Sequence, residues 1–178
     1  MVEPFHIPVM ISEVLSFLKV KESGIYIDCT LGGGGHTRAI LEKDGRVIGI
    51  DRDAGAVEYT EDKLVAYNDR FEAHVTTFSN IIEVSGIYKG EIDGVVMDLG
   101  VSSRMIDDPS RGFSYKKDGP LLMNMGCSDV NAFEIVNTKS KKELSLIFKE
   151  YGEERHARRI AGSIINFRSS HSIKTTSI

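Results

Sequence analysis

The sequence predicts an α/β protein with a parallel, doubly wound sheet. Short apolar runs, several ending in an acidic residue, recur through residues 25–98, and segments with helical periodicity separate them. Strands that alternate with helices form parallel sheets through right-handed crossover connections. Four consecutive glycines, Gly32–Gly35, follow the first apolar run. Together these two features favour a ligand site at the end of the first strand.

Each expected element of the first half of the chain has its own signal. Apolar residues such as Val14 and Leu18 recur on one side of a helix over residues 8–18. The strands are short apolar runs bounded by turn residues or acids. In chain order, the expected strands are 25–28, 46–51, 71–75 and 92–98, and the expected helices are 8–18, 36–43, 54–67 and 79–86.

The pattern changes in the second half of the chain. Residues 99–130 contain no long periodic segment and are rich in Gly, Ser, Asp and Pro. Ser140 and Glu143 have the spacing of a capping box, which predicts a helix that runs to about Glu150. A further amphipathic helix is expected over residues 153–167. We therefore expect a small helical region after the fourth strand.

The chain is expected to divide into a sheet part, residues 1–103, and a helical part, residues 104–178. Charge is distributed unevenly along it. Residues 1–100 carry 9 Lys and Arg against 17 Asp and Glu, whereas residues 101–178 carry 13 against 9. A polyanionic partner would dock on the basic second half. Ordinary surface variation would give the same imbalance, and charge alone does not separate these alternatives.

Composition excludes several classes of protein. No apolar run approaches the ~20 residues that a membrane span needs. Residues 1–6 have neither the basic region nor the apolar core of a signal peptide. Cys29 and Cys127 are the only two cysteines, and no Cys/His cluster has the spacing of a zinc site, so no metal is expected. These features favour a cytoplasmic protein with no membrane partner.

The glycine cluster does not fit the dinucleotide pattern Gly-x-Gly-x-x-Gly. Counted from Gly32, the third glycine of that pattern should stand at Thr37, and counted from Gly33 it should stand at Arg38. The third glycine normally allows close packing of the helix on the strand. A site for NAD is therefore disfavoured.

A second arrangement fits better. It places an acid at the end of the strand and glycines at every second position after it. Asp28, Gly32 and Gly34 match this arrangement, with Thr30 in place of one glycine. It is the methyltransferase-type arrangement for S-adenosylmethionine. The alternative, a glycine-rich turn without a ligand, must explain four adjacent glycines, each of which costs chain entropy.

Acidic residues stand at the expected ends of three strands. They are Asp28, Asp51 and Asp98. Ligands of open α/β sheets bind beyond these ends, at the reversal of strand order. Asp51 has nearly the spacing from the glycines that suits an acid that binds ribose hydroxyls. Each Asp could also form a turn or cap a helix, as Asp53 could do for the next helix.

Two further residues are weaker candidates. Phe78 follows the third expected strand and could flank an adenine ring, but a single Phe is more often part of the core. His36 stands at the expected start of the first crossover helix, where it could touch the carboxylate of a cofactor or cap the helix. Both alternatives stay open for each residue.

The motifs of this chain resemble those of the ribosomal small-subunit RNA cytosine-N4 methyltransferases, known as MraW or RsmH. The resemblance spans nearly the whole chain in order. Asp-Leu-Gly-Val-Ser-Ser and Arg-Gly-Phe-Ser are its most specific strings. The matching stretches are 6–9, 28–36, 50–53, 97–103, 111–114, 118–121, 151–155 and 157–161.

The resemblance implies a Rossmann-like class I methyltransferase fold with S-adenosyl-L-methionine as cofactor. It also implies a substrate, the exocyclic amine of one cytidine in small-subunit ribosomal RNA, within a 30S-type subunit. Asp98 is the candidate catalytic residue, in contact with the amine, the cofactor or both. The cofactor-binding positions that the resemblance implies are Gly34, Gly35, His36, Asp51, Phe78, Asp98 and Met105.

The chain departs from the family pattern at several positions. Met105 stands where the family has a glutamine that contacts the cofactor, so an amide hydrogen bond is lost. Leu122, Asn124 and Gly126 replace two carboxylates and one guanidinium of the family pattern. These charged groups are suited to orienting a substrate, so their replacement favours reduced activity.

The family sequence continues past Ile178 with further sheet strands. The chain is therefore expected to be a fragment with impaired activity and an exposed sheet edge open to association. A non-catalytic fragment that binds cofactor or RNA is the alternative. The candidate RNA contacts are Arg104, Arg111, Lys116, Lys117, Arg155, Arg158, Arg159 and Arg168.

Overall fold

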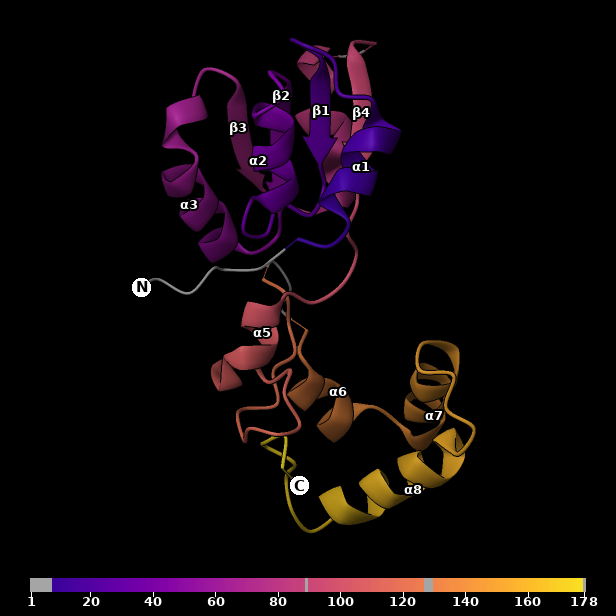
Figure 1. Ribbon diagram of the computed structural model, residues 1–178. Coiled ribbons are helices and arrows are strands. Elements are labelled where there is room, and N and C mark those ends of the chain that lie inside the picture. Colours follow the sequence, from indigo (N-terminus) through magenta and orange to yellow (C-terminus); the bar gives the residue numbers. More distant parts are fainter. Residues whose placement is uncertain (1–7, 89, 127–129, 178) are drawn as a thin grey trace. The chain divides into compact units, whose positions relative to one another are not determined.

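The computed structural model describes residues 8–88, 90–126 and 130–177 (Figure 1). The chain forms two compact units. The first consists of Met1–Arg104 and Met125–Cys127, and the second of Met105–Asn124 and Ser128–Ile178. Cys127, and His6 of the first family motif, lie outside the described residues.

The first unit is built on a sheet of four parallel strands in the order β3-β2-β1-β4. The strands are β1 (Ile25–Asp28), β2 (Arg46–Asp51), β3 (Phe71–Val75) and β4 (Ile92–Val96). The predicted bounds of the first three strands are confirmed, whereas β4 ends two residues before Asp98. Because β2 and β3 lie on one side of β1 and β4 lies on the other, the strand order reverses between β1 and β4. Ligands of open α/β sheets bind at such a reversal.

Four helices accompany this sheet. They are α1 (Ile11–Leu18), α2 (Gly35–Leu41), α3 (Ala54–Lys63) and α4 (Ile81–Val84). α1 begins later than predicted, after Met10, which has a left-handed φ of 55°. The predicted helix 54–67 is α3 followed by a 3-10 turn, Val65–Tyr67. The predicted helix 79–86 is shortened to α4 between two further 3-10 turns.

Side chains of the strands alternate between the two faces of the sheet, and each face has its own core cluster. On one face, Tyr26 and Val47 pack with apolar residues of α1 and α2. On the other face, Ile27 and Ile48 pack with apolar residues of α4. Figure 1 shows α1, α2 and α3 along the same face of the sheet. Burial of each large apolar side chain contributes about 1.5 to 3 kcal/mol, so these clusters hold the strand ends in place.

The second unit is mainly helical, and the chain enters it within α5. The helices are α5 (Ser103–Asp107), α6 (Ala132–Thr138), α7 (Lys141–Glu150) and α8 (Ala157–Arg168), with a 3-10 turn at Pro109–Arg111. The predicted start of α7 at its capping box is confirmed. α6 was not predicted. α8 begins at Ala157 rather than Glu153, which has a left-handed φ of 50°. Leu144 of α7 and Ala161 of α8 are buried in this unit.

The irregular segment before α6 depends on two glycines. Gly112 has a left-handed φ of 73°, and a Cβ atom there would meet the carbonyl oxygen of Pro120. A Cβ atom on Gly119 would meet the carbonyl oxygen of Pro109. Gly119 also donates its N–H to Thr176 Oγ1 (3.3 Å) and accepts from Thr176 N–H (3.0 Å). A larger residue at Gly112 or Gly119 would force the segments 109–112 and 119–120 apart.

The capping box of α7 makes the stability of the second unit depend on pH. Ser140 N–H donates to Glu143 Oε2 (2.8 Å), and Glu143 N–H donates to Ser140 Oγ (3.3 Å). Hydrogen bonds from Ser140, and then from Lys139, lower the pKa of Glu143 from 4.5 to about 2. Because the folded-state pKa is depressed, the stabilisation is present above about pH 4.5 and is lost as the pH falls toward about 2.

Glu143→Gln is therefore expected to remove this part of the acid sensitivity, since glutamine does not titrate. Helical circular dichroism, followed while the pH is lowered, measures the effect as a smaller loss of signal than in the wild type. Glu150→Gln, at an exposed position near the end of the same helix, is the matched control. Identical acid titrations of wild type and Glu143→Gln would contradict the role of the capping box.

Candidate functional site

The loop between β1 and α2 folds over the carboxyl end of the sheet. Leu31 N–H donates to Ile50 O of β2 (3.0 Å), so the chain turns toward β2 after it leaves β1. Gly32 and Gly34 adopt left-handed conformations with φ of 49° and 71°, and Gly34 is the N-cap of α2. Glycine adopts these angles without the penalty that a Cβ atom imposes. Gly32 and Gly34 are therefore conformational requirements of this turn.

The glycine turn packs directly on α3. Thr60 Oγ1 donates to Gly32 O (2.8 Å), and Lys63 Nζ donates to Gly33 O (2.8 Å). A Cβ atom on Gly34 would lie 2.5 Å from Thr60 Cγ2, closer than real contacts allow. Partial burial lowers the pKa of Lys63. The hydrogen bonds from α3 thus fix the backbone of the glycine turn before a ligand binds.

Asp51, predicted to bind ribose hydroxyls, lies at the end of β2 beside the glycine turn. Its Oδ2 accepts from Gly32 N–H (2.8 Å), and its Oδ1 accepts from Asp53 N–H (2.9 Å). A carboxylate offers about four acceptor positions, so each oxygen keeps one for a ligand. The side chain is partly exposed. Asp53 caps α3 by accepting from Gly55 N–H (3.1 Å), which confirms its predicted alternative role.

Asp28, at the end of β1, is only 1% exposed. Its Oδ2 accepts from Thr37 Oγ1 (2.8 Å), and its Oδ1 accepts from Thr30 N–H (3.1 Å). Burial raises the pKa of Asp28, and the hydrogen bonds from Thr37 and Thr30 oppose that rise. Both oxygens are thus engaged by neighbouring residues. Asp28 supports the glycine turn from inside the protein.

Asp98 lies just beyond β4, at the reversal of strand order, and is exposed. Its backbone N–H donates to Thr30 Oγ1 (2.8 Å). The sequence pattern was interpreted with Thr30 only as a replacement for one glycine. The hydrogen bond between Asp98 N–H and Thr30 Oγ1 was therefore not predicted. A hydroxyl residue two positions after an acid at a strand end is the signal that could have indicated it, because such side chains bond to nearby backbone groups.

The two weaker candidates have different surroundings. His36 is 6% exposed, and its Nε2 lies 3.0 Å from the backbone oxygen of Val9, just before α1. Phe78 follows β3 and is 47% exposed, so its side chain is not part of the core. A half-exposed aromatic ring is available to stack on a ligand.

The positions that depart from the family pattern fall in both units. Met105 is 8% exposed in the second unit. Leu122, in the same unit, accepts the backbone N–H of Ala132 (2.7 Å). Gly126 belongs to the first unit, where it has a φ of 100° and a Cβ atom would meet Arg52 O. Gly126 replaces one of the charged residues of the family pattern, and a side chain at this position has no room on this backbone.

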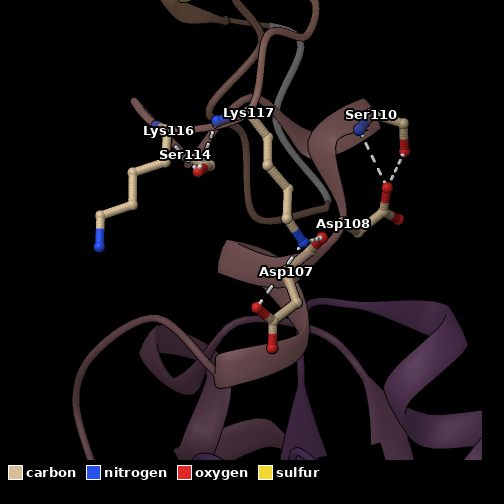
Figure 2. Close-up of polar contacts among 6 residues, drawn as sticks. All are labelled: Asp107, Asp108, Ser110, Ser114, Lys116 and Lys117. Atoms are coloured by element: carbon tan, nitrogen blue, oxygen red, sulfur yellow. Dashed lines mark hydrogen bonds and ion pairs between the residues drawn. The ribbon is translucent and has the colours of Figure 1, made fainter.

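The basic residues predicted to contact RNA are not equivalent. Lys117 Nζ donates to Asp107 O (2.8 Å), and Arg168 Nη1 donates to Val136 O (2.6 Å). Figure 2 shows the ammonium group of Lys117 beside Asp107, whereas the Lys116 side chain extends away. Lys117 and Arg168 therefore stabilise the second unit itself. The exposed members of the set are Arg104, Lys116, Lys117, Arg155, Arg158 and Arg159.

Neither a membrane helix nor a metal cluster is found in the part of the chain that the structure describes. No helix there combines the length and the apolar character needed to span a bilayer. Within the same residues, no group of three or more His, Cys, Asp or Glu side chains is placed to hold a metal ion. Cys29 is buried, and burial raises the pKa of its thiol to about 11.

The strand order β3-β2-β1-β4 and the glycine turn after β1 define a Rossmann-like fold of the class I methyltransferase type. A model of the MraW methylase family matches residues 3–178, and the chain belongs to that family. The family predicted from the motifs is confirmed. Membership of a methylase family also agrees with the expected cofactor, S-adenosylmethionine.

Curated relatives give the same family. A ribosomal RNA small subunit methyltransferase H from Fusobacterium nucleatum is 44% identical over 97% of this chain and 57% of that protein. A protein of the same name from Halothermothrix orenii is 49% identical over 96% of this chain and 56% of that protein. The chain thus spans somewhat more than half the length of these relatives. Among solved structures, it is similar to a SAM-dependent O-methyltransferase from Thermotoga maritima, with a TM-score of 0.40, 21% identity, and coverage of 44% of this chain and 32% of that chain.

Proposed function

We propose that this chain is the cofactor-binding and RNA-recognising part of an S-adenosylmethionine-dependent enzyme that methylates N4 of a cytidine in small-subunit ribosomal RNA. The match to the MraW methylase family over residues 3–178 carries this proposal. The names of the relatives support ribosomal RNA as the substrate. In this proposal residues 1–103 bind the cofactor and residues 104–178 recognise the RNA.

The residues of the first unit fit the cofactor. Asp51 presents a partly exposed carboxylate that backbone N–H groups already orient. A Cβ atom on Gly32 would have Thr30 O, at 3.6 Å, as its nearest neighbour, so the turn is open above this residue. We assign the ribose to Asp51, the adenine to Phe78, and the remaining contacts in this unit to Gly34, Gly35, His36 and Asp98. When bound, S-adenosylmethionine supplies a methyl group activated by its sulfonium.

Asp98 is assigned to the amine of the substrate. The lone pair of a cytosine amine is delocalised into the ring, so the amine is a weak nucleophile. The exposed carboxylate of Asp98 accepts a hydrogen bond from the amine N–H and holds its lone pair in line. The same carboxylate stabilises the positive charge that develops on the nitrogen. The base must leave any helical stack to reach this position.

The second unit is assigned to the RNA. Exposed Arg and Lys side chains neutralise phosphates and supply affinity that falls with salt. Arg158 and Arg159 lie on α8, and Lys116 lies in the irregular segment before α6, all exposed. Among the described strands, β4 pairs with β1 alone, so its outer edge is also open to association with another chain.

Isothermal titration with S-adenosylhomocysteine tests the cofactor part of the proposal. Saturable binding is expected, and NADH is expected to give no heat. A preference for NADH, or the absence of any binding, would overturn the cofactor assignment.

A single-turnover methylation assay on small ribosomal subunits tests the activity. We expect slower transfer than by a relative that carries the charged residues of the family pattern in place of Leu122, Asn124 and Gly126. Binding without any transfer would favour the second candidate, a module that binds cofactor or RNA without catalysis, which the departures at Leu122, Asn124 and Met105 support.

A further inference from the structure

The end of β4 lacks a main-chain partner in β1 at the point where Asp98 stands. Cys29 N–H donates to Val96 O (2.9 Å), and this bond continues the pairing of the two strands. Immediately afterwards the chain turns away from β4, because Leu31 N–H donates to Ile50 O of β2. The glycine turn therefore opens a gap between the ends of β1 and β4. A backbone N–H that has no partner strand is paired with a side chain or with water instead.

The side chain of Thr30 bridges this gap. Its Oγ1 accepts the backbone N–H of Asp98 (2.8 Å) and donates toward Asp28 Oδ1 (3.4 Å). The Asp28 carboxylate is itself fixed, since it is buried and also accepts from Thr37 Oγ1 (2.8 Å). The backbone of Asp98 is thus connected, through one hydroxyl group, to a rigid point beneath the glycine turn.

We propose that Thr30 is a positioning residue that sets where Asp98 stands relative to the glycine turn. The inference rests on the proposed function, in which both features contact one cofactor. A hydroxyl group suits this role because it accepts a hydrogen bond from one side and donates to the other. Glycine at position 30, as in the methyltransferase-type arrangement, has no side chain to make this connection.

The chain offers a matched set of variants. Thr30→Val keeps the shape of the side chain and removes the hydroxyl, whereas Thr30→Ser keeps the hydroxyl. Thr37→Val is the control, because Thr37 also donates to Asp28 and makes no contact with the Asp98 N–H. Any effect that arises only from the loss of a hydrogen bond to Asp28 should occur in both valine variants. An effect on Asp98 should occur in Thr30→Val alone.

Amide hydrogen exchange of the complete chain, followed by NMR, reads this contact directly. The Asp98 amide should exchange slowly in the wild type and in Thr30→Ser. In Thr30→Val its protection should fall at least about tenfold relative to that of Cys29, whose N–H bonds to a main-chain oxygen. Thr37→Val should leave the ratio unchanged. Exchange of the wild-type Asp98 amide at the rate of a free loop would overturn the proposal, even if Thr30→Val did not fold.

Affinity for S-adenosylhomocysteine tests the consequence for the site. Thr30→Val should weaken binding several-fold, Thr30→Ser should restore it, and Thr30→Val should have no further effect in an Asp98→Ala background. Equal losses in both backgrounds would show that Thr30 does not act through Asp98. If the wild type binds no S-adenosylhomocysteine, the proposed function fails, whereas the hydrogen-exchange result still decides the contact between Thr30 and Asp98.

Discussion

Asp51→Asn is expected to weaken the binding of S-adenosylhomocysteine by about 100-fold or more, since hydrogen bonds from two ribose hydroxyls to a charged acceptor are lost or weakened. The local structure adds to this effect. Each carboxylate oxygen of Asp51 accepts a backbone N–H, from Gly32 and Asp53. An asparagine amide accepts from one of them and turns its own NH₂ group toward the other. Isothermal titration measures the loss of affinity.

Asp62→Asn is the control for this change of charge. Asp62 lies on α3 and is exposed, so its replacement alters the net charge equally without touching the glycine turn. We expect it to bind S-adenosylhomocysteine as the wild type does. Thermal unfolding of both variants separates loss of the fold from loss of the ligand contact. Wild-type affinity in a folded Asp51→Asn protein would show that Asp51 does not bind the ligand.

Gly34→Ala is expected to destabilise the first unit by about 2 to 4 kcal/mol. Two causes add. The φ of 71° at this position is unfavourable for any residue with a Cβ atom. The new methyl group would also lie 2.5 Å from Thr60 Cγ2 and 3.3 Å from Leu64 Cδ1. Denaturant unfolding followed by circular dichroism measures the change in the free energy of unfolding.

Thr60→Ser separates the two causes. It removes Cγ2, which meets the added methyl group, and keeps Oγ1, which donates to Gly32 O (2.8 Å). In the Thr60→Ser background, Gly34→Ala should therefore cost less, and the remaining cost should reflect the left-handed backbone. An equal cost in both backgrounds would mean that α3 yields to the methyl group and that the packing of the turn is not tight.

The strands were predictable because their signal is local. The runs that became β1, β2 and β3 are short and apolar, and turn residues bound them. β4 is shorter than predicted, because Met97 continues the apolar run as far as Asp98, whereas the neighbouring strand has already turned away. The pattern in one strand cannot indicate where the partner strand leaves the sheet.

The contacts of the site were less predictable than its residue types. The acids and glycines of the candidate site were predicted from strand ends, spacing and the family resemblance, yet the bond between Asp51 and Gly32 joins residues 19 apart in sequence. The contact of Thr30 with Asp98 spans 68 positions and uses a hydroxyl group to which the sequence analysis assigned no contact. α6 was missed because its surroundings resemble a loop in composition. Side-chain partners at such distances depend on the packing of the whole unit.

Gly119 and Pro120 pair with residues near the end of the described chain, which a ribosome synthesises much later. Thr176 bonds to Gly119, and Thr175 forms an antiparallel bridge with Pro120. These partners lie 57 positions apart at Gly119, and a ribosome adds on the order of ten residues per second. The irregular loop is therefore synthesised several seconds before Thr175 and Thr176, the residues that pair with it. During that interval the loop lacks the contacts with Thr175 and Thr176 that hold it in the folded chain.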